Sequence, residues 1–109
     1  IMKKENRVLK YEEFSEIIGS SRRIRTPHFV INSRTRESGE ARIGISVSKR
    51  NGHAVTRNKI KRQIRYMIGQ GFDLSRPVDI VIVARAAYDT EDFEKEKLEL
   101  IDAIKNIGE

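Results

Sequence analysis

Residues 42–68 read RIGISVSKRNGHAVTRNKIKRQIRYMI, and this stretch decides the fold. Its first part, Arg42–Ser48, alternates apolar residues with small or polar ones, which predicts a half-buried strand. Lys49–His53 predicts a turn, in which Gly52 is free to take a positive φ. Ala54–Ile68 predicts a helix, because its apolar residues recur at spacings of three and four.

The predicted helix has two adjoining faces on a wheel that advances about 100° per residue from Arg57. A core stripe covers about 280° to 20° on the same wheel and consists of Ile60, Ile64, Met67 and Ile68. A polar face covers about 40° to 140° and consists of Asn58, Lys61, Arg62 and Arg65. Arg57 lies at the seam between the two faces.

Charge is distributed unevenly along the chain. The 109 residues carry a formal net charge of +6, yet residues 41–72 contain eight basic residues and no acidic one. A solvated helix face normally mixes charges of both signs, which adds small stabilising pairs. An acid-free face is better explained by a polyanion that neutralises it, and nucleic acid is the obvious candidate. RNA is favoured over DNA because no helix-turn-helix pair precedes the basic helix.

The remaining segments complete an α+β pattern. Lys10–Ile18 predicts a short helix, Arg22–Pro27 a basic connector and His28–Ser33 a strand. Val78–Ala84 is almost continuously apolar, as in a strand covered on both faces. Thr90 is placed to cap a last helix, whose core stripe would comprise Phe93, Leu100, Ile101, Ile104 and Ile107. The residues thus predict the order α-β-β-α-β-α around one mixed sheet.

No catalytic or metal-binding constellation is evident. The chain has no cysteine, and His28 and His53 are isolated in the sequence. The acidic groups of residues 91–102 alternate with lysines and predict a solvated face. We therefore predict no catalytic residue and no metal site in this chain. With no signal-peptide pattern and no membrane-spanning apolar run, a cytoplasmic location is expected.

The central motif is similar to a known family signature. Gly44–Arg50 (GISVSKR) followed by Gly52–Arg65 (GHAVTRNKIKRQIR) resembles the signature of the bacterial ribonuclease P protein subunit. The flanking matches are Glu13-Phe14, Phe29-Val30, Asp79-Ile80-Val81 and Ala84-Arg85. Since the resemblance covers nearly the whole chain, we expect a single RNA-binding domain over residues 2–109.

The resemblance implies a fold and a function. The family fold is a two-layer α/β sandwich with a left-handed βαβ crossover and a mixed sheet that allows one further strand, in the order α-β-β-(β)-α-β-α. Family members bind a catalytic RNA and the 5′ leader of precursor tRNA, and they promote endonucleolytic removal of that leader. The active site and its Mg²⁺ would belong to the RNA and substrate, and the protein alone would be a monomer.

The resemblance also implies two sets of binding residues. The RNA-subunit-binding set is Arg57, Asn58, Lys61, Arg62 and Arg65. The leader-binding set, in a cleft between the first helix and the sheet, is Phe14, Ile18, Phe29, Asn32, Lys49 and Arg50. Relatives often carry aromatic residues in place of Ile18 and Asn32, so less base stacking is expected here. Local capping by Asn58 and simple core packing by Phe14 are the alternative roles.

Two other functions compete with this interpretation. A general RNA-binding ribosomal or assembly protein would share the basic helix and the sandwich. A self-sufficient nuclease would require a catalytic constellation that the residues do not supply.

Overall fold

The computed structural model describes residues 2, 6–7, 10–20 and 22–109. Its elements are α1 (Tyr11–Ser20), β1 (Arg22–Arg25), β2 (Phe29–Thr35), β3 (Arg42–Val47), the 3₁₀ turn η2 (Lys49–Asn51), α2 (Ala54–Gly71), β4 (Val78–Ala84) and α3 (Phe93–Ile104). The predicted elements are all present, and one strand is added.

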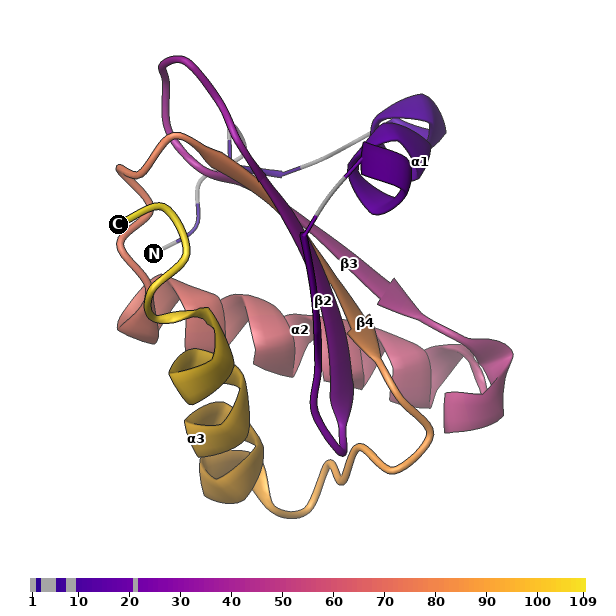
Figure 1. Ribbon diagram of the computed structural model, residues 1–109. Coiled ribbons are helices and arrows are strands. Elements are labelled where there is room, and N and C mark those ends of the chain that lie inside the picture. The colour runs from indigo at the N-terminus through magenta and orange to yellow at the C-terminus, as the bar shows by residue number, and fades with distance from the viewer. Residues whose placement is uncertain (1, 3–5, 8–9, 21) are drawn as a thin grey trace.

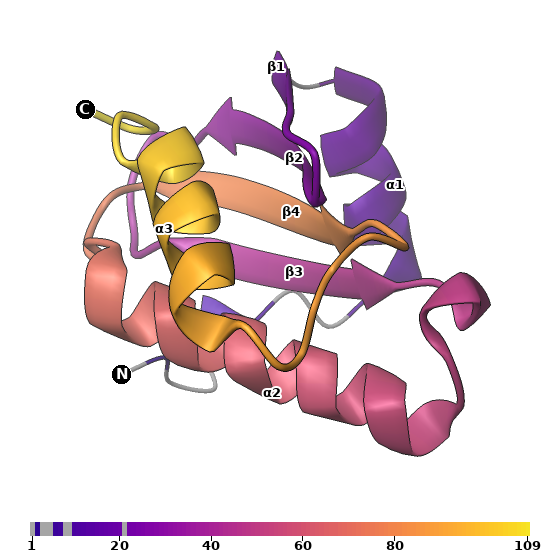
Figure 2. The ribbon, with the colours of Figure 1, turned by 90° about the horizontal axis from the view of Figure 1, so that it is seen from below.

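The four strands form one mixed sheet in the order β1-β2-β4-β3 (Figure 1 and Figure 2). β1, β2 and β4 are antiparallel neighbours, whereas β3 pairs with β4 in parallel. The helices α2 and α3 cover one face of the sheet, and α1 lies on the other. The α+β class and the mixed sheet are confirmed. β4 is central and covered on both faces, as its continuous apolar sequence predicts.

The connection from β3 through α2 to β4 is left-handed. In Figure 2, α2 passes in front of the sheet while β3 and β4 point in the same direction. When the picture is turned so that both strands point upward, β4 lies to the left of β3. This is the hand opposite to the general preference for parallel crossovers, and it agrees with the expectation from the family.

Strand alternation divides the core into two parts. Val78, Ile80 and Ile82 point toward α2 and α3, where they join the main hydrophobic cluster. Val81 points to the other face and forms a smaller cluster with Ile17 of α1. The predicted core stripe of α2 is confirmed, because its four buried residues are Ile60, Ile64, Met67 and Ile68.

The segment predicted as a basic connector contains the strand β1. It pairs with β2 so that Ile24 lies opposite Ile31, on the α3 side of the sheet. Only Ile24 is partly buried in this four-residue strand. The sequence therefore carries almost no apolar alternation to reveal it, and the pairing is supplied by β2.

Several helix ends differ from the prediction. α1 runs from Tyr11 to Ser20 rather than over Lys10–Ile18, and α3 ends at Ile104, before the predicted core residue Ile107. α2 continues to Gly71, where the missing side chain lets Ile101 of α3 approach closely: a Cβ at Gly71 would lie 2.8 Å from Ile101 Cδ1. α3 begins later than expected, since Asp92 rather than Thr90 is its N-cap and accepts a hydrogen bond from the Lys95 amide. Among the described residues, none of the helices is both long enough and apolar enough to cross a membrane.

Candidate nucleic-acid interface

Among the residues that the structure describes, none is an acidic partner for the polar face of α2. Asn58 and Arg62 are exposed, and Arg57, Lys61 and Arg65 are partly buried. Within the described part of the chain, the salt bridges to carboxylates come from other cations: His28, Arg34, Arg36, Arg42, Arg76 and Lys105. Arg57 Nε is buried without a hydrogen-bond partner. The face is therefore an uncompensated positive surface, as the acid-free sequence predicts.

A second cation adds to this surface from the N-terminal segment. Arg7 forms an isolated bridge to Ile43 at the free edge of β3. Burial, and secondarily the charge of Arg7, lower the pKa of the Arg65 guanidinium. Two like charges are thus held near each other at one end of the α2 face. Sequence reasoning missed Arg7, because nothing in its local pattern indicates pairing with β3.

The α1 side of the sheet presents side chains in three rows that run across the strands. The first row is Arg34, Asp79 and Arg42; the second is Arg23, Asn32, Val81 and Gly44; the third is Arg25, Val30, Val83 and Ser46. We call these the first, second and third rows. Val30 and Val83 are partly buried and Ser46 is exposed, so the third row is the open part of this face.

The first row is electrically compensated. Arg34 Nε and Arg42 Nε lie 3.0 and 2.9 Å from the carboxylate oxygens of the buried Asp79. Burial alone would raise the pKa of Asp79, but hydrogen bonds from Arg42 and Arg34 outweigh it and lower that pKa below its ordinary value. Glu13 of α1 also pairs with Arg42, and Glu16 with Arg34. These contacts fix α1 on the sheet.

Phe14 and Ile18 lie four residues apart on one flank of α1, next to the open rows. Phe14 is partly buried over Gly44, and a Cβ at Gly44 would lie 2.7 Å from Phe14 Cζ. Ile18 is 39% exposed. Both predicted leader-binding positions on α1 therefore face the sheet side where the cleft was expected.

Phe29, which was predicted to bind the leader, does not lie on that surface. It is fully buried in the main core on the other face and makes an edge-on contact with Tyr88, with ring centroids 5.6 Å apart. Phe29 and Asn32 are three residues apart in one strand, so their side chains point to opposite faces. That spacing was readable from the sequence and shows that both residues cannot line one groove.

Asn32 lies on the α1 side but is only 2% exposed. Its Oδ1 accepts a hydrogen bond of 3.1 Å from Arg23 Nε, which lies in the neighbouring strand β1. Arg23 thus partly covers the predicted residue and presents its own guanidinium beside it. Sequence reasoning missed Arg23 and Arg25 because it treated their segment as a connector.

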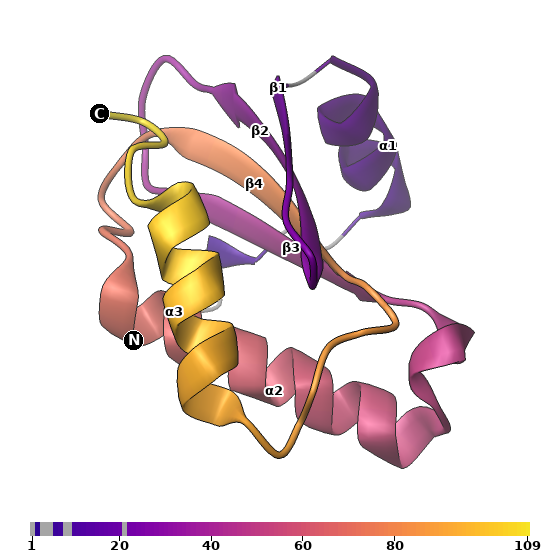
Figure 3. The same cartoon turned by 60° about the horizontal axis from the view of Figure 1, so that its bottom comes forward.

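Lys49 and Arg50 are exposed in η2, directly after β3. Gly52 follows with a φ of 118°, as the turn requires. η2 and the start of α2 lie at the end of the molecule remote from the C-terminus (Figure 3). The turn therefore connects the end of β3 with the start of α2.

His28 is not isolated, contrary to the sequence interpretation. Its Nδ1 lies 2.5 Å from Oε1 of the fully buried Glu96 and 3.3 Å from Oε1 of Glu99. The other oxygens of these carboxylates accept hydrogen bonds from the amides of Asp89 and His28 and from the Thr26 hydroxyl. The three side chains lie close enough together to bind one metal ion. The hydrogen bonds of these side chains join the β1–β2 turn to α3.

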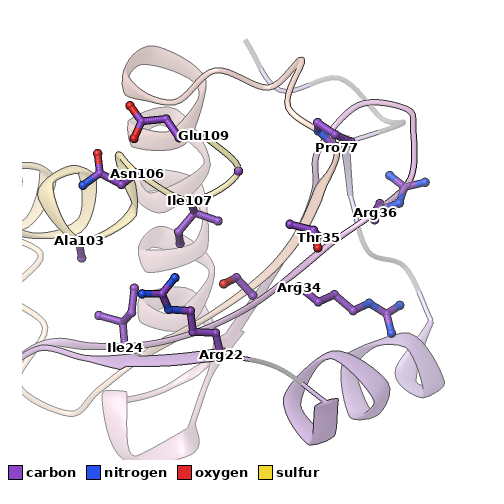
Figure 4. Close-up of a pocket in the computed structure, with 12 residues that line it drawn as sticks. Arg22, Ile24, Arg34, Thr35, Arg36, Pro77, Ala103, Asn106, Ile107 and Glu109 are labelled. Atoms are coloured by element: carbon purple, nitrogen blue, oxygen red, sulfur yellow. The ribbon is translucent and has the colours of Figure 1, made fainter.

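A pocket lies on the opposite, α3 side of the sheet (Figure 4). Arg22 and Ile24 of β1 line it together with Ala103, Asn106 and Ile107 near the C-terminus. Arg34 extends away from these residues, toward the helix at the lower right of Figure 4. Arg22 and Arg23, although adjacent in sequence, therefore serve opposite faces.

A mixed α+β sheet with one acid-free helix and a basic edge is typical of a polyanion-binding domain. Comparisons with known proteins identify which one. The ribonuclease P family model matches residues 2–108. The ribonuclease P protein component of Mesoplasma florum is 43% identical over 101 residues, covering 91% of this chain and 92% of the relative.

Solved structures agree with the sequence matches. The ribonuclease P protein of Staphylococcus aureus superposes with a TM-score of 0.76 at 30% identity, covering 95% of this chain and 98% of that chain. The Thermotoga maritima ribonuclease P protein gives a TM-score of 0.80 at 25% identity, covering 93% and 96%. The chain belongs to the ribonuclease P protein family.

Proposed function

We propose that this protein is the RNA-binding subunit of a bacterial ribonuclease P, the endoribonuclease that matures the 5′ end of tRNA. Family membership supports the role in tRNA processing. RNA binding is supported above all by the polar face of α2. Its cations Arg57, Lys61, Arg62 and Arg65 have no carboxylate partner among the described residues. This face would hold the catalytic RNA.

The α1 side of the sheet would hold the 5′ leader of precursor tRNA. It combines apolar flanks from Phe14 and Ile18 with exposed cations from Lys49 and Arg50. Single-stranded RNA is bound by this combination of stacking or apolar platforms and backbone-tracking charge. The protein would thus bind the catalytic RNA with α2 and the substrate with the adjoining sheet face.

The active site would lie in the RNA subunit. Mg²⁺ is held by carboxylates, carbonyls, water and phosphates. The polar face of α2 and the η2 turn lie in an acid-free segment, so they offer phosphate partners rather than carboxylate ligands. Mg²⁺ would be bound by the RNA and the substrate, which supply phosphate oxygens. The protein would act in the cytoplasm, as a monomer when free.

A processing assay tests this function. Purified protein is added to a bacterial ribonuclease P RNA and a precursor tRNA at low Mg²⁺, and cleavage is followed by gel electrophoresis. We expect stimulation with the RNA present and no cleavage by the protein alone. RNA binding without stimulation would favour the alternative, a ribosomal or assembly protein. Cleavage by the protein alone would place an active site in this chain.

A further inference from the structure

The strand β1 carries two arginines on the face proposed to bind the leader. Arg23 lies opposite Asn32 and Arg25 opposite Val30, so both belong to the second and third rows on the α1 side. Arg22 lies opposite Ser33, on the α3 side. β1 is the outer strand of the sheet, and all three arginines are exposed.

These two arginines differ from the arginines of the first row. Arg34 and Arg42 are neutralised by Asp79, Glu13 and Glu16. Arg23 and Arg25 form no ion pair with a described carboxylate, and Arg23 Nε donates a hydrogen bond to the neutral amide of Asn32. The α1 side therefore changes along the strands from a compensated first row to a positive edge at the second and third rows.

Asn32 holds the side chain of Arg23 through a hydrogen bond. The bond from Arg23 Nε to Asn32 Oδ1 uses one of the five guanidinium donors and restrains the plane of the group. The two Nη groups keep the fork geometry that suits a phosphate. Arg25 lies two residues further along the strand, about 6.6 Å away, so the pair is suited to two separate phosphates.

The third row connects this edge with the cations after β3. Arg25, Val30, Val83 and Ser46 run side by side across the four strands, and Lys49 and Arg50 follow the end of β3. With neighbouring strands about 4.8 Å apart, the row is about 14 Å wide. An extended single strand of RNA can cross it and meet positive charge at both ends.

We propose that Arg23 and Arg25 form a second phosphate-binding site for the leader, at the β1 edge of the sheet. This inference rests on the proposed function and adds to it. Lys49 and Arg50 bind one part of the leader, and the β1 arginines bind the phosphates several nucleotides away. The contribution of β1 therefore depends on leader length: only a leader long enough to cross the third row reaches both sites.

The test measures the affinity of the reconstituted holoenzyme for precursor tRNAs whose leaders increase from none to about ten nucleotides. We expect Arg23→Ala/Arg25→Ala to bind long-leader substrates about tenfold more weakly. The log–log salt slope should fall by about 1.4, which corresponds to two single-strand phosphates. Short and leaderless substrates should bind as they do to wild type. Arg23→Lys/Arg25→Lys should retain most of the salt slope, because it keeps the charge.

Arg22→Ala is the matched control, since it removes the same charge from the same strand on the other face. Thermal melts of each variant check that the exposed substitutions leave the fold intact. A double variant that binds long leaders as tightly as wild type, or that loses affinity equally for every leader length, overturns the β1 site. If wild-type protein gains no affinity from any leader, the proposed leader-binding function itself fails.

Discussion

The ring of Phe14 rests on the backbone of Gly44, so closely that a Cβ at residue 44 would lie 2.7 Å from Cζ and 2.9 Å from Cε1. Helix α1 can therefore pack this closely on strand β3 because residue 44 has no side chain. This contact sets the height of the aromatic ring above the second row, to which Gly44 belongs.

Gly44→Ala should force the Phe14 ring to move. We expect a loss of about 1–3 kcal/mol in the free energy of unfolding, together with weaker binding of leader-containing substrates. Gly19→Ala is the control, because a Cβ there meets no atom within 4 Å, and a helical alanine should be neutral or slightly stabilising. Urea unfolding and leader-dependent affinity are the measurements. Equal behaviour of the two variants would contradict the packing argument.

Ile18→Phe should strengthen leader binding. Ile18 is 39% exposed beside Phe14, and a phenyl ring there can stack on an unpaired base. Because stacking contributes about 1–3 kcal/mol per base, we expect at least about fivefold tighter binding of precursor tRNA with a leader. Leaderless RNA should bind unchanged. A gain that is the same for both RNAs would show that residue 18 does not contact the leader.

Arg62→Ala should weaken binding to the catalytic RNA and reduce its log–log salt slope by about 0.9, the value for one duplex phosphate. Lys59→Ala removes one charge from the same helix, but from a different flank. Gln63 lies on that flank and donates a hydrogen bond to the Thr90 carbonyl, shortly before α3. The salt slope of Lys59→Ala should stay at the wild-type value. Filter binding over a range of salt concentrations measures both, and equal slopes for the two variants would argue against a defined face.

His28→Ala should destabilise the fold. The substitution removes the imidazole that lies against the fully buried Glu96 carboxylate, and the expected loss in unfolding free energy is about 2–3 kcal/mol. His53→Ala is the matched control, because His53 is exposed and makes no side-chain capping bond; its loss should stay within about 0.5 kcal/mol. The double variant His28→Ala/Glu96→Gln also removes the buried carboxylate, so it should recover part of the lost stability. A double variant without any recovery would contradict the argument that the unpaired carboxylate causes the loss.

Asp79 should make stability depend on acid pH. Its pKa is lowered in the folded protein, so its ionised form contributes stability above the unfolded value of about 3.9. That contribution is lost as the pH falls below this value toward the folded pKa. Asp79→Asn should be less stable at neutral pH, and its unfolding free energy should fall less steeply below pH 4 (roughly the unfolded value).

Asp73 also has a lowered pKa, caused mainly by its hydrogen bonds from Ser75. It titrates in wild type and Asp79→Asn alike, so the difference between the two pH profiles isolates Asp79. Urea unfolding at a series of pH values provides both curves. Parallel curves would mean that the pKa of Asp79 is the same in the folded and the unfolded protein.

The residues themselves predicted the elements that carry strong periodicity. Val78–Ala84 was predicted with its observed bounds, and the four core residues of α2 followed from the wheel. Both rest on local apolar patterns that tertiary contacts reinforce. The acid-free face beside the stripe was equally visible, since charge composition needs no fold.

The parts that sequence reasoning missed depend on partners distant in the chain. β1 exists because β2 pairs with it, and Glu96 is buried because His28 approaches from 68 residues away. Local patterns contain neither contact, so Glu96 looked like one more solvated carboxylate. Phe29 is a different case. Strand alternation places its side chain on the opposite face of the sheet from Asn32, so the sequence alone already excluded Phe29 from the groove.

The position of β4 has a consequence for how this protein is made. Among the described strands, β4 follows the other three in the chain, yet it lies between β2 and β3, which are not neighbours in the sheet. A nascent chain that ends before Val78 therefore has the β1–β2 hairpin and an unpaired β3, and no sheet to receive α2. Folding waits for the insertion of β4. During that interval the positive charge of residues 41–72 is already exposed, so nucleic acid can engage an unfinished chain.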